Sequence, residues 1–186
     1  WTYIQISVVN KMIIPLAANE KAAQIPDDIK YSSALLTGSA HIQTYGDTNG
    51  TITEKDGYET LVLGSRGKGK RLEAITLNFN NTTGYQGEIE YRVHRQTYGW
   101  TNWMKSTMQA GTVGQAKRLE GITITVDNPK YSGGIRYKTH VQSFGWMNWA
   151  ENGELSGTYG RAKRLEAIQI ELTGEIDPAD DRKCAE

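Results

Sequence analysis

Hydrophobic and polar residues alternate along several short segments of the chain, which is the pattern of β-strands with one buried face. In residues 135–145, Tyr137 falls on one face, whereas His140 and Gln142 fall on the other. The segment 165–172 alternates in the same way, and an Asn-Gly turn signal lies between the two segments. The pattern predicts two strands joined through a short hairpin.

This pattern occurs three times, at intervals of about 46 residues. The three units span residues 37–79, 87–126 and 133–172 and are called units 1, 2 and 3. Each unit contains a block H-x-Q-[TS]-[YF]-G, which begins at His41, His94 and His140. Each also contains a G-x-x-G block followed by R-L-E-[AG]-I, which begins at Gly64, Gly111 and Gly157. Repeats of this length indicate a stack or a closed domain in which no unit buries its apolar face alone.

Closure of three such units about a pseudo-threefold axis removes exposed sheet edges. The sequence therefore predicts an all-β domain with internal pseudo-threefold symmetry, resembling a β-trefoil, with a β-prism as the alternative. A linear solenoid fits less well because no capping unit is visible. The domain is expected to span residues 36–173, between an N-terminal arm or linker at 1–35 and a C-terminal tail at 174–186.

Composition argues against several classes of protein. The 21 basic and 21 acidic residues balance, which argues against a nucleic-acid partner. No apolar run approaches the roughly 18 residues of a membrane-spanning helix. The single cysteine, Cys184, excludes an internal disulfide but not export. No Ser-His-Asp or HExxH pattern is present, so neither an enzyme activity nor a cofactor is predicted.

The combination of H-x-Q-x-x-G-W, a second W, G-T-x-G and R-L-E-[AG]-I resembles the clostridial hydrophobic W (ChW) repeat. Units 2 and 3 carry the full pattern, at His94, Gln96, Trp100, Leu119 and Glu120, and at His140, Gln142, Trp146, Leu165 and Glu166. Unit 1 departs from it, because Asp47 occupies the place of the tryptophan and an insertion follows. The resemblance implies a secreted or surface-displayed module of Gram-positive anaerobes, of the kind found beside adhesion, protease or polysaccharide-degrading domains.

Aromatic and amide side chains of units 2 and 3 are the candidate ligand-binding residues. Sugars present apolar C–H faces that stack on indole rings, while amide groups bind their hydroxyls. Trp103 and Trp149, in the predicted hairpins, are better candidates for a ligand surface than Trp100 and Trp146, which are expected to fill the core. The candidate set is Trp103, Trp149, Trp100, Trp146, Tyr98, Phe144, Asn102 and Asn148.

The repeated His, Gln and Glu residues are interpreted as structural. A buried carboxylate needs a partner, and the arginine or histidine of the same unit is the obvious one. Three equivalent histidines also match a zinc ligand set, but no Cys or acidic cluster completes it, so no metal is predicted. Glutamates in separate units have no reason to converge as a glycosidase pair. The structural set is His41, His94, His140, Gln43, Gln96, Gln142, Glu73, Glu120 and Glu166.

The glycine blocks and the basic pairs have simple interpretations. The G-x-x-G blocks lack the G-K-[ST] continuation and the helix of a phosphate loop, so they are predicted to be tight turns. The Lys-Arg pair before each L-E is expected to be solvated, with a sulfated or sialylated glycan as the alternative role. The even spread of these pairs argues against a single nucleic-acid track.

These features favour a non-catalytic ligand-binding or adhesion module of a secreted or cell-surface protein, whose partner is a glycan or a cell-surface or extracellular protein. Two alternatives stay open: a structural subunit of a surface or phage-tail assembly, and an accessory module of a cell-wall or polysaccharide hydrolase. An active site would break the repeat symmetry. The only acids that do so, Asp47, Glu54 and Asp56 in unit 1, are interpreted as loop residues.

Overall fold

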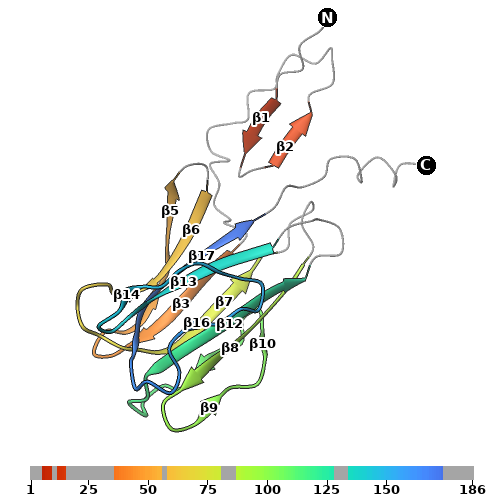
Figure 1. The fold of residues 1–186 in the computed structure, drawn as a ribbon. Helices are drawn as coiled ribbons and strands as arrows, with labels where there is room; N and C mark the ends of the chain where they lie inside the picture. The colour runs from red at the N-terminus through yellow and green to blue at the C-terminus, as the bar shows by residue number, and fades with distance from the viewer. Residues whose placement is uncertain are drawn as a thin grey trace, which may run out of the picture.

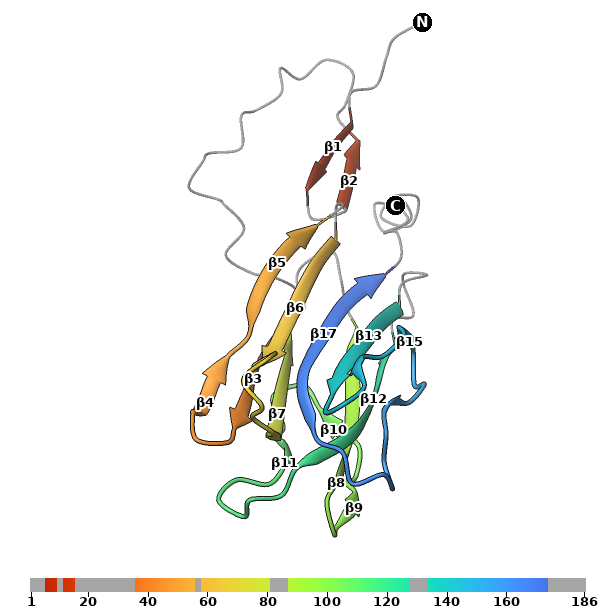
Figure 2. The same ribbon diagram turned by 60° about the vertical axis from the view of Figure 1, so that its left-hand side comes forward.

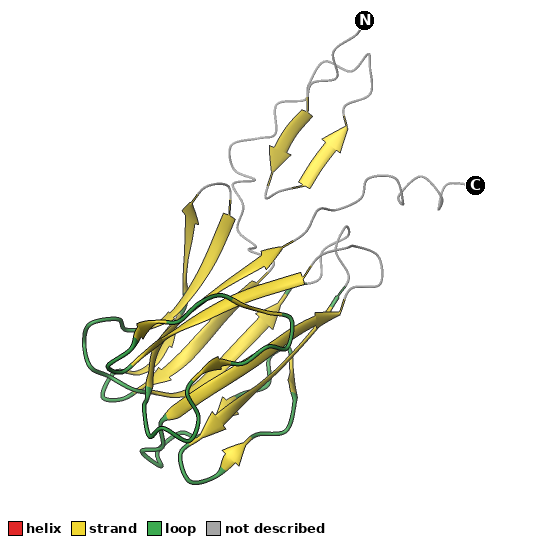
Figure 3. Ribbon diagram, viewed as in Figure 1, coloured by secondary structure: helices red, strands yellow, loops and turns green. Residues whose placement is uncertain are grey.

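The structure is a computed structural model that describes residues 6–9, 12–15, 36–55, 58–80, 87–127 and 134–173. Every helix or strand assigned in these residues is a β-strand, so the all-β prediction is confirmed (Figure 3). The described part of the chain accordingly contains no helix that could span a membrane. Within the predicted arm, β1 (Ile6–Val9) pairs antiparallel with β2 (Met12–Pro15). The rest of the arm and the predicted tail lie outside the described residues.

Each unit contributes one pair of long antiparallel strands (Figure 1). The pairs are β3 (Leu36–Ile42) with β7 (Leu72–Phe79), β8 (Glu88–Arg95) with β12 (Leu119–Asp127), and β13 (Gly134–Val141) with β17 (Leu165–Thr173). Alternating burial along these strands puts one face of each pair into the core.

Short strands extend each pair at the edge of its first long strand. They are β4 (Gly46–Asn49) on β3, β9 (Gly99–Trp100) and β10 (Met104–Lys105) on β8, and β14 (Gly145–Trp146) and β15 (Ala150–Glu151) on β13. The insertion of unit 1 forms a hairpin of its own, β5 (Thr51–Lys55) with β6 (Tyr58–Gly64).

The last long strand of each unit is covered by a strand from a different unit. β11 (Ala110–Gly111) of unit 2 pairs with β7 of unit 1, and β16 (Ser156–Gly157) of unit 3 pairs with β12 of unit 2. β6 of unit 1 pairs with β17 of unit 3 (Figure 2). Apart from β1 and β2, the strands lie in three separate sheets, and no closed barrel of the kind a β-trefoil requires is found among the described residues.

The first glycine of each G-x-x-G block sits where two units approach closely. At Gly111 (φ 124°), an added Cβ would lie 2.3 Å from the carbonyl oxygen of Glu73 and 2.5 Å from Cα of Ala74. The next residue, Thr112, donates its backbone N–H to that same carbonyl at 2.9 Å. The second glycine, Gly114 (φ 74°), has open space around it and serves the turn alone. The tight-turn interpretation therefore holds for the second glycine, whereas the first is needed for contact between units.

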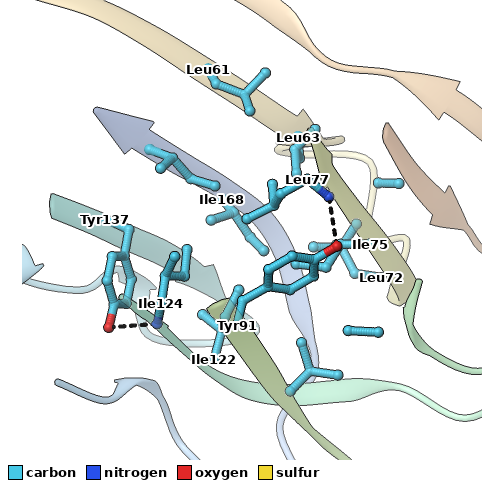
Figure 4. Packing of buried hydrophobic residues seen from close by; sticks show 14 of the residues in the cluster. Leu61, Leu63, Leu72, Ile75, Leu77, Tyr91, Ile122, Ile124, Tyr137 and Ile168 are labelled. Atoms are coloured by element: carbon cyan, nitrogen blue, oxygen red, sulfur yellow. Dashed lines mark hydrogen bonds between the residues drawn. The ribbon is translucent and has the colours of Figure 1, made fainter. Parts of the chain in front are cut away.

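The core is one cluster to which all three units contribute (Figure 4). Its largest aromatic side chains, Tyr91 and Tyr137, are fully buried and also connect neighbouring units. The hydroxyl oxygen of Tyr91 accepts a hydrogen bond from the backbone N–H of Leu77 in unit 1 at 2.9 Å. That of Tyr137 accepts one from Ile124 in unit 2 at 3.0 Å. Both hydroxyls donate to a backbone carbonyl of their own unit.

Candidate functional site

The outward-facing residues of β8 form the floor of a candidate site. Alternation buries Ile89, Tyr91 and Val93, so Arg92 and His94 point away from the core. After the hairpin tip the chain turns back along the edge of β8, where Trp100 stands opposite His94 and Met104 stands opposite Tyr91. The indole rings of this segment therefore lie beside the outward side chains of β8.

Two tryptophans flank one cationic side chain in unit 2. The guanidinium carbon of Arg92 lies 4.9 Å from the ring centre of Trp100 and 4.6 Å from that of Trp103. Cations at such distances are attracted to the negative face of the indole ring, by about 0.5–1 kcal/mol at exposed sites. We call Arg92, Trp100 and Trp103 the unit-2 tryptophan cluster.

Unit 3 repeats this arrangement with a lysine. The ammonium nitrogen of Lys138 lies 5.4 Å from the ring centre of Trp146 and 4.4 Å from that of Trp149. Lys138 precedes His140 by two residues, as Arg92 precedes His94. These three residues are the unit-3 tryptophan cluster, and the same geometry has formed twice on different sheets.

The clusters lie at the surface rather than in the core. Trp103 is 40% exposed, and the other three tryptophans of the clusters are half-buried. The expectation that Trp100 and Trp146 fill the core is therefore wrong, because the inward aromatic positions of units 2 and 3 are occupied by Tyr91 and Tyr137. The neighbouring amides, Asn102 and Asn148, are exposed to solvent.

Residues from the next unit enlarge the unit-2 tryptophan cluster. The ring of Tyr159, from the G-x-x-G turn of unit 3, lies 5.9 Å from Trp100 and 5.3 Å from His94 between ring centres. His94 meets Trp100 edge-on at 5.4 Å. Gly121 leaves room beneath them, since an added Cβ would lie 3.1 Å from Leu155 and 3.7 Å from Trp100. A continuous aromatic surface results, to which two units contribute.

An ion pair between Arg136 and Glu171 lies beside the unit-3 tryptophan cluster. Arg136 lies 4.8 Å from the ring centre of Trp149 and binds the buried carboxylate of Glu171 through Nε at 2.7 Å. The other carboxylate oxygen accepts a hydrogen bond from the hydroxyl of Thr60, in unit 1, at 2.6 Å. This cluster therefore also depends on a contact between units.

Unit 1 has no tryptophan cluster. Ser39 occupies the place of Arg92 and Lys138, and Asp47 takes the place of the first tryptophan. The carboxylate of Asp47 binds His41 Nδ1 at 2.7 Å instead. The outer face of unit 1 is therefore polar, which matches its departure from the repeat pattern.

The family model of the clostridial hydrophobic W (ChW) repeat matches the chain twice, at residues 94–128 and 140–174. Units 2 and 3 are therefore ChW repeats. The matches begin at His94 and His140 and extend through the L-E block of the same unit. Searches of the curated proteins and of the solved structures found no match.

The glutamate of each ChW repeat is buried at a β-bulge. In the ladders, Leu119 pairs with Arg95 and Gly121 pairs with His94, so Glu120 has no partner across the strand. The same register shift occurs at Glu166 and, outside the matched repeats, at Glu73 of unit 1. The bulge interrupts the alternation of the strand at this glutamate, which is nevertheless buried.

The arginine of the same unit forms an ion pair with this glutamate, and the histidine lies beside it. In unit 2, Arg118 Nη2 lies 2.7 Å from Glu120 Oε1, and His94 Nδ1 lies 3.1 Å from Oε2 without the alignment of a hydrogen bond. The contacts in unit 3 are nearly identical, at 2.8 and 3.1 Å. In unit 1 the arginine contact persists at 2.7 Å, while His41 lies 4.0 Å away and turns to Asp47. The glutamates thus have the partners that the sequence suggested.

The glutamines that recur in the three units form hydrogen bonds through their backbone N–H groups. The N–H groups of Gln43, Gln96 and Gln142 each donate to the carbonyl of the arginine in the Lys-Arg pair of their own unit, at 3.0 Å. The histidines lie on three different sheets, and within the described residues no group of His, Cys, Asp and Glu is arranged to hold a metal ion.

Tyr98 and Phe144 do not join the tryptophan clusters. They occupy the hairpin tips and are 50% and 51% exposed. Sequence reasoning missed Arg92, Lys138 and Tyr159, which complete the clusters. A signal for the first two existed, since a cation precedes the histidine by two residues only in the units that carry tryptophans.

Proposed function

We propose that the chain is a non-catalytic binding module of a secreted or surface-displayed bacterial protein, and that its ligand lies on the tryptophan clusters of units 2 and 3. The observation that carries the proposal is the repeated placement of two partly exposed indole rings around one cation. The ChW repeats in units 2 and 3 support the surface location, since such repeats are modules often found in surface proteins.

The chemistry of the clusters fits a carbohydrate best, or an extended segment of a cell-surface protein. An indole face packs against the apolar C–H face of a sugar ring, and the Arg92 guanidinium or Lys138 ammonium donates to its hydroxyl oxygens. Exposed Asn102 and Asn148 add amide donors and acceptors beside the rings. Aromatic residues with a polar surround also dominate the binding energy of protein interfaces.

We further propose that the three units close as a pseudo-threefold ring, with unit 1 as a divergent third repeat. Support comes from the strand pairing, in which unit 2 covers unit 1, unit 3 covers unit 2 and unit 1 covers unit 3. Three separate sheets favour the β-prism alternative over the β-trefoil. In such a ring, each outer sheet face is available to a ligand independently.

A glycan and matrix-protein array probed with the intact chain, followed by titration of the best ligand, tests the binding proposal. Trp103→Ala and Trp149→Ala should each weaken binding by about tenfold or more, because central aromatic contacts dominate such interfaces. Ile52→Ala is the control, because Ile52 of unit 1 is as exposed as Trp103, at 40%, and its loss should leave this binding unchanged. If both tryptophan variants are folded and bind as well as the parent, the clusters are not the site.

A further inference from the structure

The turns that precede the last strands of the units gather at one end of the molecule. The arrows of β7, β12 and β17 run toward the end at which the described chain stops, and their preceding turns lie opposite (Figures 1 and 2). The hairpin tips after β3, β8 and β13 lie there too, because each pairs antiparallel with one of these strands. We call this surface the loop end; it consists of turns 43–45, 64–71, 96–98, 111–118, 142–144 and 157–164 and of the strand residues within two positions of them.

An exposed aromatic ring stands on each hairpin tip of the loop end. Tyr45, Tyr98 and Phe144 are 50%, 50% and 51% exposed. The residues on either side have positive φ angles, 73° at Thr97 and 71° at Gly99 in unit 2, and similar values in the other units. This unusual backbone holds each ring outward at an equivalent place in all three units, including the unit that has lost its tryptophans.

A lysine accompanies every one of these tips. The lysine of the Lys-Arg pair lies 5.9 Å from the ring centre of Tyr45 in unit 1, and 5.5 Å from that of Tyr98 in unit 2. In unit 3, Lys163 donates to the hydroxyl of Ser143, beside Phe144, at 3.2 Å. The pair therefore divides its roles, since the arginine binds the buried glutamate and the lysine stays at the surface.

The loop end carries an excess of positive charge that acidic groups do not cancel. Its glutamates are buried and paired with arginine, and its one exposed acid, Asp47, binds His41. Within the described residues, no ion pair is formed by the remaining cations, Arg66, Lys68, Lys70, Arg95, Lys117, Arg161 and Lys163. The overall charge balance thus conceals a basic end.

Acidic residues collect at the opposite end of the strands. Glu54 and Glu59 face each other across the β5–β6 hairpin, and Glu88 pairs with Asp127 where β8 begins and β12 ends. Positive charge therefore predominates at the loop end and negative charge at the opposite end of the strands. This distribution turns the loop end toward a negatively charged partner.

We propose that the loop end is a second binding site, which takes an anionic polysaccharide through the three tip aromatics and the lysines beside them. Sulfate or carboxylate groups of the chain meet the lysines, and the C–H faces of its sugar rings pack on the tip rings. The proposal rests on the proposed function only in placing the protein outside the cell. It uses residues that the tryptophan clusters do not.

The arrangement of the loop end favours a polysaccharide over a lipid surface or a nucleic acid. Cations lie over the faces of Tyr45 and Tyr98, so these tips present charge and ring together rather than a bare apolar wedge for lipid. Single-stranded nucleic acids bind along a basic groove with successive stacking platforms, whereas these tips belong to three separate sheets. A flexible polysaccharide reaches all three from one chain.

Binding of the intact chain to immobilised dextran sulfate and polygalacturonate, with neutral dextran as reference, tests the proposal. The parent should bind at least one polyanion at 0.15 M salt on the order of micromolar affinity and ignore neutral dextran. Lys70→Gln/Lys117→Gln/Lys163→Gln should bind about tenfold or more weakly and with a salt slope reduced by about two. Replacing the same lysines with arginine should preserve binding, and Lys105→Gln, which removes an exposed lysine outside the loop end, should not affect it.

A second variant tests the aromatic part independently of charge. Tyr98→Ser/Phe144→Ser should weaken polyanion binding while the melting temperature stays close to that of the parent, because exposed substitutions usually alter stability by under about 0.5 kcal/mol. Trp103→Ala and Trp149→Ala should leave polyanion binding intact, so failure here and failure of the tryptophan clusters are distinguishable. Equal or tighter binding to duplex DNA, to oligo(dT) or to phosphatidylglycerol vesicles would overturn the proposal, as would full binding by the triple glutamine variant.

Discussion

The two faces of β8 and β13 use aromatic residues in opposite ways. On the inner face, Tyr91 and Tyr137 are fully buried and connect units through their hydroxyl groups. On the outer face, tryptophans from the neighbouring edge segment lie over a cation and stay partly exposed. The tyrosines therefore stabilise the core, whereas the tryptophans of the repeat lie at the surface.

Unit 1 shows that both faces can be changed if another element compensates. At the inner tyrosine position it has Gly38, and side chains of Leu61 and Leu77 fill the space. Among the described residues, no tyrosine hydroxyl bonds unit 1 to unit 3. Instead, β6 pairs with five residues of β17, whereas β11 and β16 are only two residues long. The backbone hydrogen bonds between β6 and β17 thus make the contact between units that a buried tyrosine makes elsewhere in the molecule.

The largest expected effect tests the inner face. Tyr137→Ala should lower the free energy of unfolding by about 3–5 kcal/mol, since it removes a fully buried ring and leaves the N–H of Ile124 without its acceptor. Tyr137→Phe keeps the ring and should cost only about 1–3 kcal/mol. Burial raises the pKa of Tyr137 to about 12, so this difference should not change between pH 6 and pH 9. Urea denaturation followed by tryptophan fluorescence measures both variants.

The next effect concerns the seam between units. Gly111→Ala should cost about 2–3 kcal/mol or more, because the new Cβ would clash with the carbonyl of Glu73 and φ is 124°. Gly114→Ala is the control: its φ of 74° lies in the left-handed region that Thr97 also adopts, so the backbone penalty is smaller, and nothing lies near the new methyl group. Equal losses for the two variants in urea denaturation would mean that close contact between units 1 and 2 does not stabilise the fold.

Much of the inner face was predictable from sequence because burial and the two-residue period coincide there. Ile168 and Ile170 lie in the core where the alternation places them, and Glu166 has the arginine and histidine partners expected for a buried carboxylate. The exchange of strands between units was not predictable, since Ala110–Gly111 is too short for any alternation to show. The only sequence feature related to this exchange is Gly111, since a glycine allows two backbones to approach closely.

The site was predicted less completely than the core. The tryptophans stood out by residue type, but their burial depended on the course of the chain after the hairpin tip, which composition does not reveal. Arg92 and Lys138 carry charges of the ordinary surface kind, so nothing in their type distinguishes them. Tyr159 reaches the unit-2 cluster from another unit, and that contact exists only after strand exchange.

A smaller effect is expected on the outer face. Trp146→Ala should cost about 1–2 kcal/mol, because a half-buried ring loses its contacts with Lys138 and His140 but opens no cavity in the core. Thermal and urea denaturation of Trp146→Ala and Tyr137→Ala under the same conditions compare the free energies of unfolding lost at the two faces. A loss as large as that of Tyr137→Ala would show that the tryptophan holds the fold after all, and would reverse the comparison.

The smallest effect comes from an acid at an inner-face position. Glu59 follows the alternation that buries Leu61 and Leu63, and its pKa is raised above 4.5 by burial first and by the charge of Glu54 second. Because the pKa of Glu59 is higher in the folded protein than in the unfolded chain, the protonated carboxyl favours the folded state. This contribution to the free energy of unfolding is fully present below pH 4.5 and is lost as the pH rises through the pKa of the folded state. Glu59→Gln should therefore be slightly more stable than the parent at pH 7 and no more stable at pH 3. Urea denaturation of both proteins at the two pH values checks this, with Glu151→Gln, at an exposed position, as the control. If the advantage of the glutamine were the same at both pH values, the charge of Glu59 would not be its cause, and the inner face would tolerate an ionised carboxylate at the end of β6.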